Sequence, residues 1–123
     1  MTSEAKTRER LALLSQISLA LPETSREDQG SHASFIIRKK VFAYYLNNHH
    51  GDGIVSVCCK VLPGDNQRLI AASPHKFYLP AYIGPRGWIG LRLDLPTVDW
   101  AEVQELLRGS YAQIAPKKLS SLL

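Results

Sequence analysis

Two short clusters of chemically reactive side chains stand out in the sequence. His49, His50 and Asp52 lie in a segment rich in Gly and Asn, and Cys58 and Cys59 follow as an adjacent pair. Imidazole, thiolate and carboxylate groups are the usual ligands of zinc, which takes four of them in a tetrahedral site. Adjacent histidines on a turn rarely close such a site, and no fourth ligand follows at a known spacing. We therefore expect these histidines to be exposed loop residues and predict no metal site.

The two cysteines are poor candidates for a disulfide or a nucleophile. Neighbouring residues do not normally bridge, so the pair favours a reducing, cytoplasmic compartment. A reactive thiol needs a nearby base and an electropositive niche, and the adjacent charge in sequence is Lys60 alone. We expect one cysteine in the core and the other partly exposed. Nucleophile elbows, phosphate-binding glycine loops and paired carboxylates are also missing, so we predict no catalytic residues and no cofactor.

Positive charge is concentrated in the middle of the chain. Residues 29–92 carry eight Lys and Arg against two Asp, a net charge of +6, whereas the segments on either side each carry −1. A surface of one sign attracts polyanions, so nucleic-acid binding is the leading hypothesis. Basic side chains on the sheet face and its hairpin turns would contact phosphates, and aromatic ones would stack on unpaired bases. The candidate residues are Lys39, Lys40, Lys60, Arg86, Arg92, Trp88 and Tyr44.

The length of 123 residues predicts a single domain, 1–123, with its own hydrophobic core. The N-terminal residues alternate charges and contain no long apolar run, so we expect neither a signal peptide nor a membrane span.

Hydrophobic alternation predicts a β-sheet. Three β-rich segments separated by short polar turns predict an antiparallel meander at 34–37, 41–46 and 54–61. Residues 88–95 alternate most cleanly and should turn an aliphatic side toward the core. Segment 77–83 contains a proline and should be an edge strand or extended chain, and 23–32 could hold a further short edge strand.

Helical spacing and capping signals predict the remaining elements. Apolar residues recur at helical spacing over 7–21, where Pro22 ends the helix. A short helix is expected at 65–72 with Asp65 as its N-cap. Asp99 opens a later helix that Gly109 should end, and Ser110 with Gln113 should cap a second short helix, followed by a last turn or tail.

Several short motifs follow one another in a distinctive order: Lys40-Val41-Phe42-Ala43, Val57 to Lys60, the turn from Gly84 to Trp88, Asp99-Trp100, Ser110-Tyr111 and Ala115-Pro116-Lys117-Lys118-Leu119. In order and spacing they resemble the MmcQ/YjbR family of small bacterial proteins. The resemblance implies an α+β, frataxin-like (CyaY-like) fold, with an antiparallel sheet of five or six strands and the N- and C-terminal helices on one face. It also implies predicted DNA binding in a double-wing arrangement, which favours DNA over RNA as the partner, and it supplies no catalytic residues.

The resemblance in fold does not import iron chemistry. Frataxin-like iron binding would require an acidic ridge on the first helix, but Glu4 and Glu9 stand there among Lys6, Arg8 and Arg10.

A protein-interaction module is the alternative function. A half-covered aromatic sheet face could form a homodimer or take a peptide along an edge, and its candidate residues are Phe42, Tyr44, Tyr78, Tyr82 and Trp88. The two hypotheses differ in whether the exposed face is apolar or is ringed by Lys60, Arg86 and Arg92.

Overall fold

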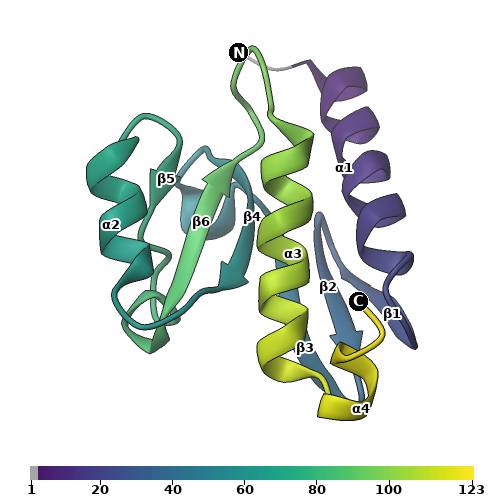
Figure 1. Ribbon diagram of the computed structural model, residues 1–123. Helices are drawn as coiled ribbons and strands as arrows, with labels where there is room; N and C mark the ends of the chain where they lie inside the picture. The colour runs from purple at the N-terminus through teal and green to yellow at the C-terminus, as the bar shows by residue number, and fades with distance from the viewer. Residues whose placement is uncertain (1–2) are drawn as a thin grey trace.

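The computed structural model describes residues 3–123, except for the side chain of His50. It contains a six-stranded antiparallel sheet in the order β1-β2-β3-β4-β6-β5 (Figure 1). The strands are β1 (Thr24–Gln29), β2 (His32–Ile37), β3 (Lys40–Asn47), β4 (Val55–Lys60), β5 (Phe77–Tyr78) and β6 (Trp88–Arg92). The helices are α1 (Glu4–Leu19), α2 (Asp65–Ala72), α3 (Trp100–Ile114) and α4 (Lys117–Ser120), with short 3-10 turns η1 (His49–Gly51) and η2 (Gly84–Arg86).

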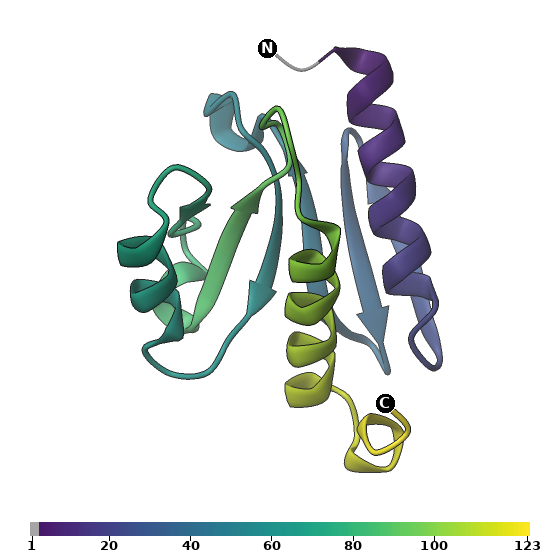
Figure 2. The same cartoon turned by 45° about the horizontal axis from the view of Figure 1, so that its top comes forward.

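The terminal helices cover one face of the sheet, as predicted for this α+β class. Helix α3 packs across β3 and β4, and α1 lies beside it over β1 (Figures 1 and 2). The core lies between these layers, and the predicted aliphatic side of β6 enters it through Ile89, Leu91 and, just beyond the strand, Leu93, which are at most 3% exposed. Neither α1 nor α3 covers the opposite face of the sheet (Figures 1 and 2).

The predicted meander is confirmed as β2, β3 and β4, with one irregularity that strict alternation could not show. Phe35 pairs with Ala43 but Ile36 pairs with Val41, so Phe42 is an extra residue on β3. At such a bulge two consecutive side chains can turn to one face. Phe42 is accordingly buried against Tyr111 of α3, with ring centroids 5.6 Å apart. Its predicted place on the exposed aromatic face is therefore wrong.

Two predicted helix boundaries are also wrong. Helix α3 continues through Gly109 and Ser110, because the flanking Leu107 and Tyr111 are fully buried and hold both halves of the helix on the sheet. Tertiary packing here outweighs the weak helix propensity of glycine. Helix α2 has Gly64, not Asp65, at its N-cap position.

A buried arginine ties α1 to the chain leading into α3. Arg10 is only 6% exposed, and its guanidinium donates hydrogen bonds to the carbonyls of Leu93 (2.6 Å), Leu95 (2.5 Å) and Pro96 (3.1 Å). The helical spacing of the apolar residues in 7–21 did not predict this burial. The carbonyls satisfy the donors of a charged group that would otherwise be costly to bury.

The packing of Gly90 yields a stability prediction. An added Cβ at Gly90 would collide with the ring of Tyr78, its register partner on β5. We expect Gly90→Ala to lower the free energy of unfolding by about 1–3 kcal/mol, measured by urea denaturation. Gly109→Ala is the matched control, because a Cβ there meets no atom within 4 Å. It should raise stability by about 0.5–1 kcal/mol, and equal losses in both variants would contradict this packing.

Candidate nucleic-acid interface

Four of the predicted basic residues come together at one end of the sheet. Lys39 lies in the β2–β3 turn and Lys40 begins β3. Lys60 ends β4 and pairs with Trp88, which begins β6 just after Arg86 in η2. Because neighbouring strands are antiparallel, β2 and β4 finish at the same end of the sheet at which β3 and β6 begin. This is the lower end in Figure 1.

Helix α4 adds two lysines that the sequence analysis assigned only to a last turn or tail. The pKa of Glu23 is lowered mainly by its hydrogen bond from Arg38 of the β2–β3 turn, and the charge of Lys118 contributes to the same shift. Helix α4 therefore lies beside that turn, at the same end of the molecule (Figures 1 and 2). We define the cationic end as Lys39, Lys40, Lys60, Arg86, Lys117 and Lys118.

No residue of the cationic end forms an ion pair within the described part of the chain, although Lys118 lies close enough to Glu23 to interact with its charge. The ion pairs there involve other basic residues, among them Arg38 with Glu23 and Arg68 with Asp65. Lys39, Lys40, Arg86 and both lysines of α4 are exposed, and Lys60 is half-buried. These side chains can therefore take anionic partners from solution.

The backbone of Lys60 is held on both sides by α3. Its N–H donates to Ser110 Oγ (3.0 Å), and its carbonyl accepts from Gln113 Nε2 (3.2 Å). The Ser110 hydroxyl in turn donates to the carbonyl of Phe42 on β3 (2.6 Å). Ser110 and Gln113, which were predicted to form a capping box, thus bind the backbone of β3 and β4 instead, because no helix begins at Ser110.

The turn that carries Arg86 is also fixed by hydrogen bonds. Gly87 adopts a left-handed conformation (φ 92°) and its carbonyl accepts from the Val61 N–H (2.8 Å). Buried Asn66 donates to the carbonyls of Gly84 (3.0 Å) and Trp88 (3.2 Å). A groove of about 650 Å³ follows this turn and is lined by Lys60, Arg86 and Gln113. It presents two cations on a rigid frame.

The β2–β3 turn holds two basic residues in a strained conformation. Arg38 (φ 50°) and Lys39 (φ 68°) both adopt positive φ, as a two-residue type I′ hairpin turn requires. Asn-Gly is the usual choice there, since a residue with a Cβ costs about 1 kcal/mol or more in this region. The chain thus carries positive charge where the fold alone would favour glycine.

The other three residues predicted for the interface, Arg92, Trp88 and Tyr44, are not part of the cationic end. Arg92 lies at the opposite end of β6 and pairs with Asp94 through two hydrogen bonds of 2.9 and 3.1 Å, which raise its pKa. Trp88 is 8% exposed and its ring lies 5.5 Å from that of Tyr44, centroid to centroid. Little of the Trp88 ring is left for a base, whereas Tyr44 is half-buried on the uncovered face.

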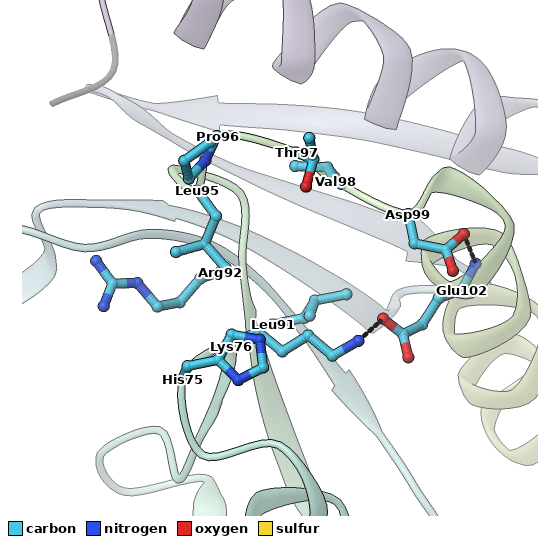
Figure 3. Close-up of a pocket in the computed structure, with 10 residues that line it drawn as sticks. All are labelled: His75, Lys76, Leu91, Arg92, Leu95, Pro96, Thr97, Val98, Asp99 and Glu102. Carbon is cyan, nitrogen blue, oxygen red and sulfur yellow. Dashed lines mark hydrogen bonds and ion pairs between the residues drawn. The ribbon is translucent and has the colours of Figure 1, made fainter.

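A cavity of about 280 Å³ lies at this opposite end, between the chain before β5 and the start of α3. Figure 3 shows Lys76 reaching across it to Glu102 (2.9 Å), while Arg92 points elsewhere. Asp99, the N-cap of α3, accepts from the backbone N–H of Glu102 (3.2 Å). Lys76 and Arg92, which line this cavity, are thus paired with Glu102 and Asp94. The cavity is therefore a weak candidate for binding phosphate.

The uncovered face of the sheet is aromatic and apolar, and it is hollowed. A pocket of about 380 Å³, here called the aromatic pocket, lies between β2–β3 and the segment after β5. The residues important to its chemistry are His32, Tyr44, Asp52, Tyr78 and Tyr82. Of the two alternatives for this face, the apolar one fits: Lys60 and Arg86 lie at one end of the sheet, and Arg92 lies at the other end of β6.

The histidine and cysteine clusters have structural explanations. His49 is half-buried, with its ring edge-on to His32 at 5.1 Å, while the side chain of His50 lies outside the described residues. Both cysteines are free and buried, so the expectation of a partly exposed one is wrong; the Tyr78 hydroxyl lies 3.8 Å from Cys58 Sγ. Burial raises the pKa of Cys58 to about 11, and that of Cys59 further, so both are poor nucleophiles at neutral pH.

Within residues 3–123, apart from the undescribed side chain of His50, no group of three metal-ligating side chains is found. No helix in the same range is long and apolar enough to cross a membrane.

The geometry defines the class: an α+β protein with an antiparallel sheet, helices on one face, a cationic end and an aromatic pocket on the other face. The family model YjbR matches residues 19–113, and the chain belongs to that family.

The crystal structure of a Deinococcus radiodurans protein, which carries a domain of the family model DUF419, is similar in fold. It has a TM-score of 0.68 and 22% sequence identity, over 85% of this chain and 78% of the other. Among curated proteins, none matches the chain significantly.

The position of Ser110 yields a second stability prediction. Ser110→Ala removes the partner of a buried N–H and a buried carbonyl, so we expect a loss of about 1–3 kcal/mol in the free energy of unfolding. Ser18→Ala is the matched control: Ser18 is fully buried on α1, and its Oγ has no hydrogen-bond partner among the described residues. It should be neutral or stabilising in urea denaturation. Equal losses would show that the Ser110 bridge contributes nothing specific.

Proposed function

We propose that the protein is a non-enzymatic nucleic-acid-binding protein that holds duplex DNA by its cationic end. The supporting observation is the gathering of six basic side chains from the β2–β3 turn, β3, β4, η2 and α4, none of them in an ion pair within the described part of the chain. Phosphate contacts of this kind supply affinity and position without reading sequence. The predicted DNA binding that the family resemblance implies points the same way.

The arrangement of the cationic end suits a double helix. In the sheet order, β4 with Lys60 lies between β3, which begins beside the β2–β3 turn, and β6, which follows η2. The two basic turns therefore flank a central lysine, as two wings would, and α4 extends the surface beside the first turn (Figure 1). Wings of this kind contact the backbone and respond to the shape of the duplex.

Salt dependence tests this proposal. Each phosphate neutralised should contribute about 0.9 to the slope of log K against log salt concentration. We expect Lys117→Ala with Lys118→Ala to weaken binding to all duplex sequences about equally and to reduce the slope by nearly two, measured by fluorescence anisotropy. The matched control is Lys6→Ala with Arg8→Ala, which removes two exposed cations from the far end of α1. If both double variants lose the same amount of salt slope, the loss reflects only the lower net charge of the protein, and this interface is rejected.

The strained turn yields a prediction in which stability and binding change in opposite directions. Lys39→Gly relieves the positive φ at this position, so the free energy of unfolding should rise by about 0.5–1 kcal/mol. The same change removes a phosphate contact, so DNA affinity should fall and the salt slope should decrease by about one. Urea denaturation and anisotropy measure the two effects. If the variant is more stable but binds DNA with unchanged affinity and salt slope, Lys39 does not contact DNA.

The second candidate is the protein-interaction module, and the apolar character of the uncovered face favours it. Tyr82 is 81% exposed at the edge of the aromatic pocket. Large exposed aromatic groups on a hollowed surface are typical of binding sites. This surface is separate from the cationic end, so the two functions are compatible in one molecule.

A further inference from the structure

The aromatic pocket is a small-molecule cavity more than an extended peptide groove. It is bounded by β2 and β3 on one side, by the Tyr78 to Ile83 segment on another, and by the η1 loop. Its volume of about 380 Å³ falls within the range of ligand sites.

Two of its aromatic walls are held in place by the sheet. The Tyr78 ring lies over Gly90, and its hydroxyl is 2.6 Å from Ser56 Oγ on β4. Tyr44 is fixed from the other side by its contact with the buried ring of Trp88. The pocket therefore exists before any ligand arrives, which lowers the entropic cost of binding.

Tyr82 supplies a third aromatic ring under backbone strain. Its φ of 67° lies in the left-handed region, which is costly for a residue with a Cβ, and its side chain is 81% exposed. Strain retained at an exposed aromatic residue is typical of a binding site, where it sets the direction of a side chain.

Carboxylates outnumber cations around the pocket. Among the described residues that line it, Asp52 is the only charged one apart from histidine, and Glu27 is the register partner of Ser34, which also lines it. The charge of Arg92 interacts with Asp52, but its guanidinium is paired with Asp94. The balance of charge here therefore favours a cationic ligand over an anionic one.

We propose that the aromatic pocket binds a small organic cation, of the methylated or quaternary ammonium class. Tyr44, Tyr78 and Tyr82 line the pocket. A cation held against their rings is attracted by the ring quadrupoles, and its methyl groups suit an apolar lining. Asp52 supplies a carboxylate at the rim: its Oδ1 accepts from the Ile54 N–H at 2.9 Å, which orients the group. This site is independent of DNA binding.

The test compares choline with its uncharged isostere, 3,3-dimethylbutan-1-ol, by amide chemical-shift titration of the whole chain. We expect saturable shifts at Ser34, Asp52 and Tyr82 with choline, and an affinity for the uncharged isostere at least about fivefold weaker. Equal affinity for the two compounds, no saturable shifts, or shifts confined to other surfaces would each overturn the proposal.

Variants separate this site from the fold and from the cationic end. Tyr82→Ala should weaken choline binding about two- to fivefold, whereas Tyr82→Phe, which keeps the ring, should retain it. Asp52→Asn keeps the acceptor for the Ile54 N–H but removes the charge, and it should also weaken binding. Lys60→Ala with Arg86→Ala should leave choline binding unchanged, so loss of DNA binding and loss of choline binding are separable. Retention of full choline affinity in Tyr82→Ala and Asp52→Asn would place the ligand elsewhere.

Discussion

One serine hydroxyl joins the helical layer to the sheet at the end where positive charge gathers. Ser110 Oγ lies between the Phe42 carbonyl on β3 and the Lys60 N–H on β4, so it completes the hydrogen bonding of both strands just beyond their last register pair, Ala43 with Cys59. Gln113, one helical turn later, holds the Lys60 carbonyl. The position of α3, the burial of Phe42 and the placement of Lys60 all depend on this bridge. A hydroxyl can do this because it donates and accepts at once.

The two ends of the molecule use their charges differently. At one end six basic side chains have no ion-pair partner among the described residues, and at the other Arg92 and Lys76 are paired with Asp94 and Glu102. The uncovered face between them is aromatic, with acidic groups near its pocket. This distribution of charge is the basis of both proposals, an anionic partner at the cationic end and a cationic ligand in the aromatic pocket. Glycine at position 90 makes the second surface possible, since it leaves room for the Tyr78 ring.

Local patterns predicted most of the secondary structure. Period-2 alternation located β2, β4 and β6, and the proline in segment 77–83 correctly indicated an edge strand. The same patterns failed wherever a distant contact decided the outcome. The bulge at Phe42 reversed one side chain, Gly109 stayed helical because its neighbours are buried, and Arg10 turned inward to carbonyls more than eighty positions away. Each failure has a long-range partner that no window of sequence contains.

The sequence by itself determined the class of fold, the family and the excess of positive charge between residues 29 and 92. These follow from residue types and spacing, which act locally through propensity, alternation and composition. Only the tertiary structure decided which basic residues lie close together. It places Arg92 away from the other predicted basic residues, beside Asp94, and it brings Lys117 and Lys118 near the β2–β3 turn. It also decided that the side chain of Trp88 is buried and that of Tyr82 is exposed. The physical reason is that burial and ion pairing depend on strand register and helix packing, which bring distant residues together.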